Sequence, residues 1–344
     1  MSPRPSKSGI RNMLRVSLLI LLTCVAAGAN LFRLPTANQA IFERGSEDKF
    51  FVGTVGKPWT SGTFGCVRTE GWQLHEGLDI RCLQRDKRGE PTDPVMATAD
   101  GLVTYVNRRT GLSNYGNYLI LKHNIDGVEI YSLYAHLREI RADLKTGLDV
   151  KAGETIAIMG RTSNTPQPIS KDRAHVHFEL NFLINDRFAE WYRKNHPGER
   201  NDHGDWNGQN LVGIDPQAVL LADHGQGKSF AFAHFIRQQT ELCRVLVRNT
   251  NFPWLRRYPQ FVRSNAVAQA QGVAAYEIAL NFNGLPYELI PRAASEIKSK
   301  TAVQLLSVNE AEYSRNPCRR LVARRGSRWE LTPHGQSLIS LLTF

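Results

Sequence analysis

Hydrophobic residues alternate with polar residues in short runs from about residue 51 to residue 182. The runs are rich in β-branched and aromatic residues and are separated by glycine-containing turns, which is typical of strands. No long helical period interrupts them. The segments that read as strands lie within 94–106, 117–123, 128–136, 155–159 and 175–182. The pattern predicts a mainly antiparallel β domain over residues 51–220.

Two dipeptides mark turns between these strands. Asp100-Gly101 and Asp126-Gly127 each lie between apolar runs, and Asp-Gly is a strong signal for a tight hairpin. We therefore expect a β-hairpin at each dipeptide. Residues 30–50 show no clear pattern and are expected to be a linker, whereas the polar residues 185–212 are expected to form a solvated loop.

The pattern changes after about residue 215. Residues 230–247 and 262–282 carry a helical period. Further on, a hairpin is expected to turn at Arg325-Gly326. A terminal helix is expected to begin with Thr332 as its cap and Pro333 at its first position. We expect residues 221–344 to form an α-rich C-terminal accessory domain, whose end resembles a winged-helix module.

The N-terminus has the features of an export signal. Basic residues at 7, 11 and 15 precede an apolar run at 16–29 that ends in the cleavage pattern Ala-Gly-Ala. The run is shorter than the roughly 20 apolar residues that a membrane-spanning helix needs. Residues 1–29 are therefore predicted to be a signal peptide. An uncleaved membrane anchor is the alternative, and the membrane is a partner only in that case. Both place the bulk of the protein in the periplasm or cell envelope.

Export changes what the charge implies. A formal net charge of +11 favours anionic partners in general. An exported protein does not meet chromosomal DNA, so we expect no nucleic-acid partner. Export also permits disulfides among the four cysteines after residue 29. Their order suggests the pairs Cys66–Cys82 and Cys243–Cys318, although four cysteines allow three pairings. The alternative is that these cysteines are unpaired, buried thiols.

Candidate chemistry begins at residues 75–79, HEGLD. The stretch opens like the helical HExxH zinc motif, but Gly77 disfavours a helix by roughly 1 kcal/mol, so a loop or strand end is expected. A second cluster is HVHFEL at 175–180. In a strand, His175 and His177 would point to one face, with Val176 and Phe178 on the other. Adjacent buried imidazoles each need polar partners, which is unusual in a plain core.

The chain carries three motifs in order, which are HxxxD, a lone histidine after a strand, and HxH. This order resembles the lysostaphin-type, or LytM-like, zinc metallopeptidases, which cut peptide bridges of bacterial peptidoglycan. The resemblance covers about residues 51–220. It includes PVMATADGLV, YGNYLILKH, YAHL, VKAGETIAIMG and NLVGIDP at 94–103, 115–123, 134–137, 150–160 and 210–216. It implies three zinc ligands, which are His75, Asp79 and His177. It also implies two catalytic histidines that do not bind zinc, His136 and His175.

The chemistry of these residue types agrees with that assignment. Two imidazoles and one carboxylate leave a fourth zinc position open, as in catalytic rather than structural sites. Zinc lowers the pKa of bound water to about 7, and histidine suits proton transfer at neutral pH. Glu179 continues the face of the two histidines and is expected to be either a residue that orients a ligand or a surface carboxylate. The segment 161–174 is longer than the family's usual approach to HxH and is expected to border the groove.

The sequence therefore predicts an exported zinc metalloendopeptidase that hydrolyses peptide cross-links of peptidoglycan. The alternative is a non-catalytic wall-binding or amidase-activating protein on the same fold. Because no ligand position is missing, the resemblance favours the enzyme. The basic residues of 221–344 are expected to bind an anionic envelope polymer or an envelope protein, unless the region merely packs on the catalytic domain.

Overall fold

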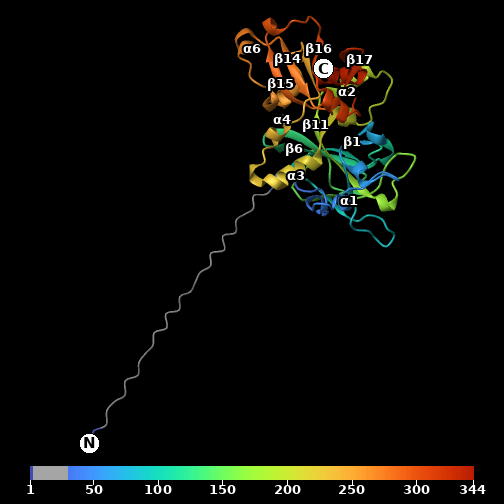
Figure 1. The fold of residues 1–344 in the computed structure, drawn as a ribbon. Helices are drawn as coiled ribbons and strands as arrows, with labels where there is room; N and C mark the ends of the chain where they lie inside the picture. The colour runs from blue at the N-terminus through green and yellow to red at the C-terminus, as the bar shows by residue number, and fades with distance from the viewer. Residues whose placement is uncertain (3–29) are drawn as a thin grey trace.

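The computed structural model describes residues 1–2 and 30–344, so the predicted signal peptide lies, apart from its first two residues, outside the described part (Figure 1). Among the described residues, no helix is both long and apolar enough to cross a membrane.

A seven-stranded antiparallel sheet forms the centre of the molecule. Along the sheet, the order is β12 (Leu211–Ile214), β11 (His175–Leu183), β7 (Val128–Ala135), β6 (Tyr118–Ile125), β5 (Gly101–Asn107) and β9 (Asp149–Val150). The seventh strand, β3 (Leu78–Arg81), pairs with the first half of β11, while β12 pairs with the second half. The predicted antiparallel β domain is confirmed.

Two smaller sheets flank this one. The first is β4 (Pro94–Met96), β10 (Thr155–Ile158) and β8 (Glu139–Ile140), and the second is the hairpin β1 (Gly65–Arg68) with β2 (Gln73–His75). The hairpin expected at Asp126-Gly127 is confirmed, since Ile125 pairs with Val128 and both turn residues have positive φ. The hairpin expected at Asp100-Gly101 is wrong. There, β4 pairs with β10, and the chain crosses to another sheet before β5.

Two segments predicted to lie outside the core belong to it. In residues 30–50, which include the short helix α1 (Glu47–Phe50), the side chains of Phe32, Ile41 and Phe50 are buried in the main core. Within 185–212, helix α2 (Phe188–Asn195) buries Phe188, Trp191 and Tyr192. Residues 30–50 are thus packed rather than a linker. The segment 185–212 begins with a packed helix, but residues 193–209 are exposed or half-buried, as expected of a solvated loop.

The C-terminal region contains helices, as expected, around an antiparallel sheet that was not predicted. Its strands are, in order, β15 (Pro286–Arg292), β14 (Ala275–Leu280), β13 (Cys243–Val247) and β16 (Val303–Val308). The helices are α3 (Pro216–Gln226), α4 (Phe232–Arg237), α5 (Pro253–Arg257), α6 (Ala266–Gln271), α7 (Glu310–Arg315) and α8 (Pro333–Leu342).

The helical periods of 230–247 and 262–282 extend over only a few residues each. Helix α4 gives way to β13, and α6 ends at Gly272, whose φ of +90° leads into β14. The last elements match the prediction. The hairpin β17 (Val322–Arg325) and β18 (Arg328–Leu331) precedes α8, where the Thr332 side chain accepts the Gly335 amide. The winged-helix resemblance stays a prediction.

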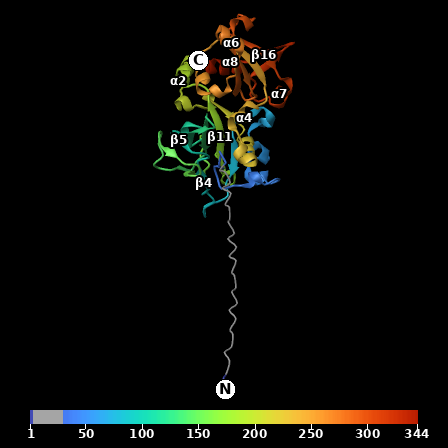
Figure 2. The same cartoon turned by 90° about the vertical axis from the view of Figure 1, so that its left-hand side faces the viewer.

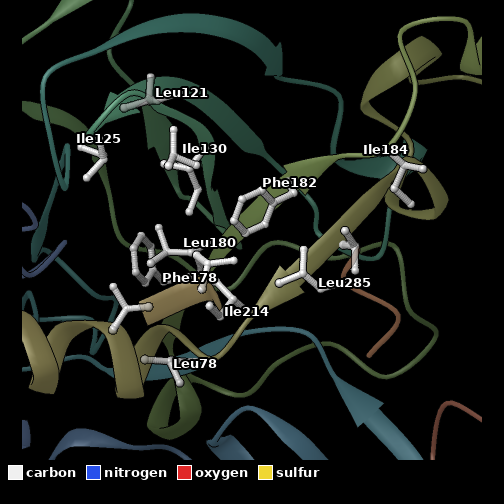
Figure 3. Packing of buried hydrophobic residues seen from close by; sticks show 14 of the residues in the cluster. Leu78, Leu121, Ile125, Ile130, Phe178, Leu180, Phe182, Ile184, Ile214 and Leu285 are labelled. Atoms are coloured by element: carbon white, nitrogen blue, oxygen red, sulfur yellow. The ribbon is translucent and has the colours of Figure 1, made fainter. Parts of the chain in front are cut away.

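The two parts of the chain share one hydrophobic core. Figure 1 shows β14 and β16 at one end of the molecule with β11 nearer its middle, and Figure 2 shows β16 and β11 in the same relation. Strand β11 belongs to the seven-stranded sheet. Phe178, Leu180 and Phe182 pack together with Leu285 of the C-terminal region in one cluster (Figure 3). Across the boundary, the Tyr258 hydroxyl accepts the Leu183 amide at 3.1 Å. The C-terminal region therefore packs on the seven-stranded sheet.

The cysteines also join the two parts. Cys66 in β1 and Cys318 form a disulfide, while Cys82 and Cys243 are free and buried. The predicted pairs Cys66–Cys82 and Cys243–Cys318 are wrong. Sequence order favours short loops, but here the partner of Cys66 comes from the other end of the fold, a placement that only tertiary packing decides.

Candidate metal centre

The HEGLD segment forms two strand ends rather than a helix. His75 ends β2, Asp79 lies within β3, and Glu76 and Gly77 join them. A Cβ on Gly77 would lie 2.3 Å from the carbonyl oxygen of Phe178 in β11. Only glycine permits this approach, which brings β3 into register with β11. In that register, Asp79 is the direct cross-strand partner of His177.

Strand β11 separates apolar and polar side chains onto two faces. Val176 and Phe178 belong to the main core, together with Leu180 and Phe182. His175, His177, Glu179 and Asn181 alternate with them, and all four are nearly inaccessible. The expected alternation is therefore present, and the polar face extends two residues beyond the histidines.

Three predicted ligands converge on one point. His75 Nε2 lies 3.1 Å from Asp79 Oδ1 and 3.1 Å from His177 Nδ1, and His177 Nδ1 lies 3.0 Å from Asp79 Oδ1. Donors at zinc bonds of about 2.0–2.1 Å in a tetrahedron would be roughly 3.3 Å apart. The three atoms form the only metal-type group found among the described residues.

The outer atoms of these side chains fix their orientation. His75 Nδ1 faces the Thr63 carbonyl at 2.7 Å, and His177 Nε2 faces Glu179 Oε1 at 2.8 Å. Both outer nitrogens therefore carry the hydrogen, which leaves a lone pair on each inner nitrogen. The second oxygen of Asp79 accepts Arg68 at 2.6 Å. With a metal ion in place of the proton on His177, all three inner atoms can face one cation, so the donor set fits a divalent metal ion.

Glu179 anchors the outer side of His177. Its carboxylate accepts the Tyr115 hydroxyl and the Asn181 amide, each at 2.6 Å. Burial raises the pKa of Glu179, but hydrogen bonding and charge from His177 bring its net pKa below the usual value. The carboxylate is thus ionised and completes a carboxylate–histidine pair of the kind that supports metal ligands. Of the two readings of Glu179, the orienting residue is the one that the structure supports.

The charges of the site favour bound cations. Burial alone raises the pKa of Asp79, yet His175, His75 and His177 bring its net pKa well below the usual value. Burial lowers the pKa of His177, but hydrogen bonds with Asp79 and Glu179 raise it to about 10. A metal ion at His177 therefore displaces a proton, and its binding weakens as pH falls.

His136 and His175 lie beside this group. The His175 Nε2 atom is 3.4 Å from Asp79 Oδ1, and the His136 and His175 ring centres are 4.9 Å apart. Their Nδ1 atoms face the carbonyls of Thr162 and Arg173 at 2.8 and 2.6 Å, which leaves both Nε2 atoms as proton acceptors. Burial lowers the pKa of both rings, most strongly that of His136.

His136 follows β7 directly and has a φ of +60°. A non-glycine residue in the left-handed region costs roughly 1–3 kcal/mol, and such strain is concentrated at functional sites. Its amide donates to the Tyr115 carbonyl at 2.8 Å, which helps to hold the turn.

Other residues considered in the sequence have plainer roles. His123 is buried and bonds the Asp100 carbonyl and the Ser132 hydroxyl, as expected for a packing residue. Glu76 is exposed and is not part of the donor group. Arg68 was missed, because its contact with Asp79 depends on how β1 and β2 pair.

Residues 73–188 match peptidase family M23. A DD-carboxypeptidase/endopeptidase, Mpg, of Neisseria meningitidis serogroup B is 35% identical over 108 residues, which are 31% of this chain and 20% of that protein. The murein hydrolase activator NlpD of Escherichia coli is 34% identical over 120 residues, 35% of this chain and 25% of that protein. The chain thus spans only about a fifth to a quarter of these relatives.

Solved structures are also similar to part of this chain. A zinc-containing peptidase from Vibrio cholerae is 33% identical, with 31% of this chain and 26% of that chain covered and a TM-score of 0.23. The catalytic domain of lysostaphin from Staphylococcus simulans is 27% identical, with 35% and 74% covered and a TM-score of 0.24. The match of residues 73–188 to peptidase family M23 supports the lysostaphin-type peptidase family that the histidine motifs predict.

Proposed function

We propose that this protein is an exported zinc metalloendopeptidase that hydrolyses peptide cross-links of bacterial peptidoglycan. One observation carries the proposal. His75, Asp79 and His177 present three inward donor atoms within 3.0–3.1 Å of one another, and each has an outer partner that fixes it. A protein that only binds peptidoglycan has no need of such a donor set.

The chain's own residues would carry the proton transfers. Zinc at the three ligands would supply a Lewis acid that polarises the scissile carbonyl and acidifies water. His136 and His175 have depressed pKa values and are neutral near pH 7, with Nε2 free to accept a proton. Once protonated, either ring can stabilise the developing oxyanion or donate to the leaving amine. We propose that they share these two tasks.

A second function, activation of a separate amidase, is supported by the relatives named as murein hydrolase activators. The donor set favours the enzyme, because an activator gains nothing from two further neutral histidines beside the metal ligands. Export belongs to the same proposal, since peptidoglycan lies outside the cytoplasm. Sequencing the amino terminus of protein recovered from the envelope would test cleavage after residue 29.

The test uses purified protein and isolated peptidoglycan. We expect soluble peptide fragments to appear, a chelator to stop their release and added zinc to restore it. Zinc-loaded protein that releases no fragments alone but accelerates a purified amidase would contradict the enzyme and support the activator.

A further inference from the structure

A hollow next to the HEGLD segment is lined by residues from both parts of the chain. Its volume is about 450 Å³, and its polar lining includes Glu76, His196, Gln209, Arg319 and His334. We call it the arginine hollow. Glu76 follows the proposed ligand His75 directly. It also lines a neighbouring hollow of about 620 Å³ that includes His75 itself. The two hollows therefore meet at Glu76, the residue next to the proposed ligand His75.

Arg319 brings a positive charge to this hollow and forms no ion pair within 4 Å among the described residues. Its Nε atom is buried and has no hydrogen-bond partner among the described residues. Burial lowers the pKa of Arg319, and the charge of Glu76 offsets this only in part. Arginine stays charged in proteins and carries five donors, so a half-buried guanidinium with unmet donors favours an anion.

The position of Arg319 is fixed from both sides. Cys318 forms the disulfide with Cys66 in β1, and its amide faces the Cys66 sulfur at 3.3 Å. On the other side, the Arg320 guanidinium lies 5.2 Å from the centre of the Trp72 ring. The φ of Arg320 is +49°, a strained value that the surrounding contacts maintain. Arg319 is thus held against the β1–β2 hairpin that supplies His75.

We propose that Arg319 binds a carboxylate of the peptide substrate in the arginine hollow and so determines which peptides are cleaved. This rests on the proposed function. Peptidoglycan stem peptides carry free carboxylates in side chains and at their ends, and a guanidinium recognises a carboxylate through two parallel hydrogen bonds. Gln209 and the nearby histidines offer further donors, and Glu76 is the one carboxylate in the lining.

The experiment compares two peptides by calorimetric binding to the zinc-loaded protein. One is an N-acetylated stem tetrapeptide with free carboxylates, and the other is the same peptide with carboxamides. Hydrogen bonds to a charged partner contribute about 1.5–3 kcal/mol, so the acid should bind roughly 10- to 100-fold more tightly than the amide. Arg319→Gln should remove this preference, and Arg319→Lys should keep part of it. Arg328→Gln, an exposed arginine of the same region, should leave it unchanged.

A second variant avoids any folding defect at Arg319. Glu76→Gln lies on an exposed side chain and removes the competing carboxylate, so the acid peptide should bind several-fold more tightly. The proposal is overturned if Arg319→Gln retains the preference, if the wild type has none, or if Glu76→Gln changes nothing. A preference that survives Arg319→Gln would place the carboxylate on the metal instead. Because binding needs no turnover, a protein that cleaves nothing would refute the proposed function and still give this result.

Discussion

At the scale of single residues, the division between ligands and catalytic histidines is the clearest claim. The Nδ1 atom of His177 points into the donor group and lies 3.0 Å from Asp79 Oδ1. His136 lies outside that group, with its ring centre 6.0 Å from the ring centre of His177. Strand alternation predicts that His175 and His177 share a face, whereas their roles and that of His136 follow from the resemblance to the family. The sequence could not predict Arg68 or the left-handed backbone of His136, which depend on neighbouring strands.

The first prediction concerns metal content. His177→Ala should lose zinc and activity together, and His136→Ala should keep about one zinc per chain and lose turnover. His234→Ala, an exposed histidine far along the chain, is the matched control and should change neither property. Metal analysis of the purified variants decides the matter. A metal-free His136→Ala protein would show that the division of roles is wrong.

The second prediction concerns pH and His123. Burial lowers the pKa of this histidine to about 4 in the folded protein, against about 6.5 when unfolded. Between these values, the unfolded chain binds the extra proton. The stability that the neutral ring provides is therefore present above pH 6.5 and is lost as pH falls towards 4. The loss should reach about 3 kcal/mol, since each pKa unit corresponds to 1.36 kcal/mol.

Denaturant unfolding at several pH values, with wild type and His123→Gln side by side, measures this effect. The stability advantage of the wild type over the variant should shrink by about that amount from pH 7 to pH 4. A difference that stays constant across the range would exclude His123 as a source of the pH dependence.

At the scale of elements, the positions of the strands were easier to predict from the sequence than the way in which the strands pair. Strand β11 and the hairpin of β6 and β7 follow from alternation and Asp-Gly alone. The pairing of β4 with β10 does not, because residues 97–100 carry the chain to another sheet. The helical period predicted for 230–247 and 262–282 is present only in the short helices α4 and α6. The residues that follow each helix form strands of the C-terminal sheet instead.

The third prediction tests the register of β3 on β11. Gly77→Ala places a Cβ 2.3 Å from the Phe178 carbonyl oxygen, so the strands must separate. Overpacking of this kind costs about 1–3 kcal/mol, and Asp79 should move away from His177. We expect lower stability and weaker zinc binding, measured by unfolding and by chelator competition. Gly111→Ala, where a Cβ meets nothing within 4 Å, is the control. Normal zinc affinity in Gly77→Ala would contradict the role given to this glycine.

At the scale of the whole molecule, the C-terminal region packs on the seven-stranded sheet as one unit. Asn283 donates to the Gly213 carbonyl at 2.8 Å, and Asn185 donates to that of Leu341 at 2.7 Å. Sequence patterns marked the change near residue 215 but could not show that the two parts share a core. The region's role in envelope binding stays a prediction.

The fourth prediction follows from this packing. A chain that ends at Leu220 would expose Phe182 and its neighbours, which now pack on Trp254, Tyr258 and Phe261. We expect that fragment to be insoluble or unfolded.

Removing the disulfide tests the same packing in the full-length protein. The double variant Cys66→Ser/Cys318→Ser should fold but lose about 2–5 kcal/mol of stability. Circular dichroism and thermal melts distinguish these cases, and a folded, zinc-binding fragment would refute the shared core.

The central claim, that this protein itself cuts peptide bonds in peptidoglycan, is tested most directly by identifying the products. Purified zinc-loaded protein is incubated with peptidoglycan alone, and the released fragments are analysed by mass spectrometry beside those from His136→Ala. The account predicts fragments with a new amino terminus within the peptide cross-links, and none from the variant. Intact cross-links after prolonged incubation with zinc-loaded wild-type protein would contradict it.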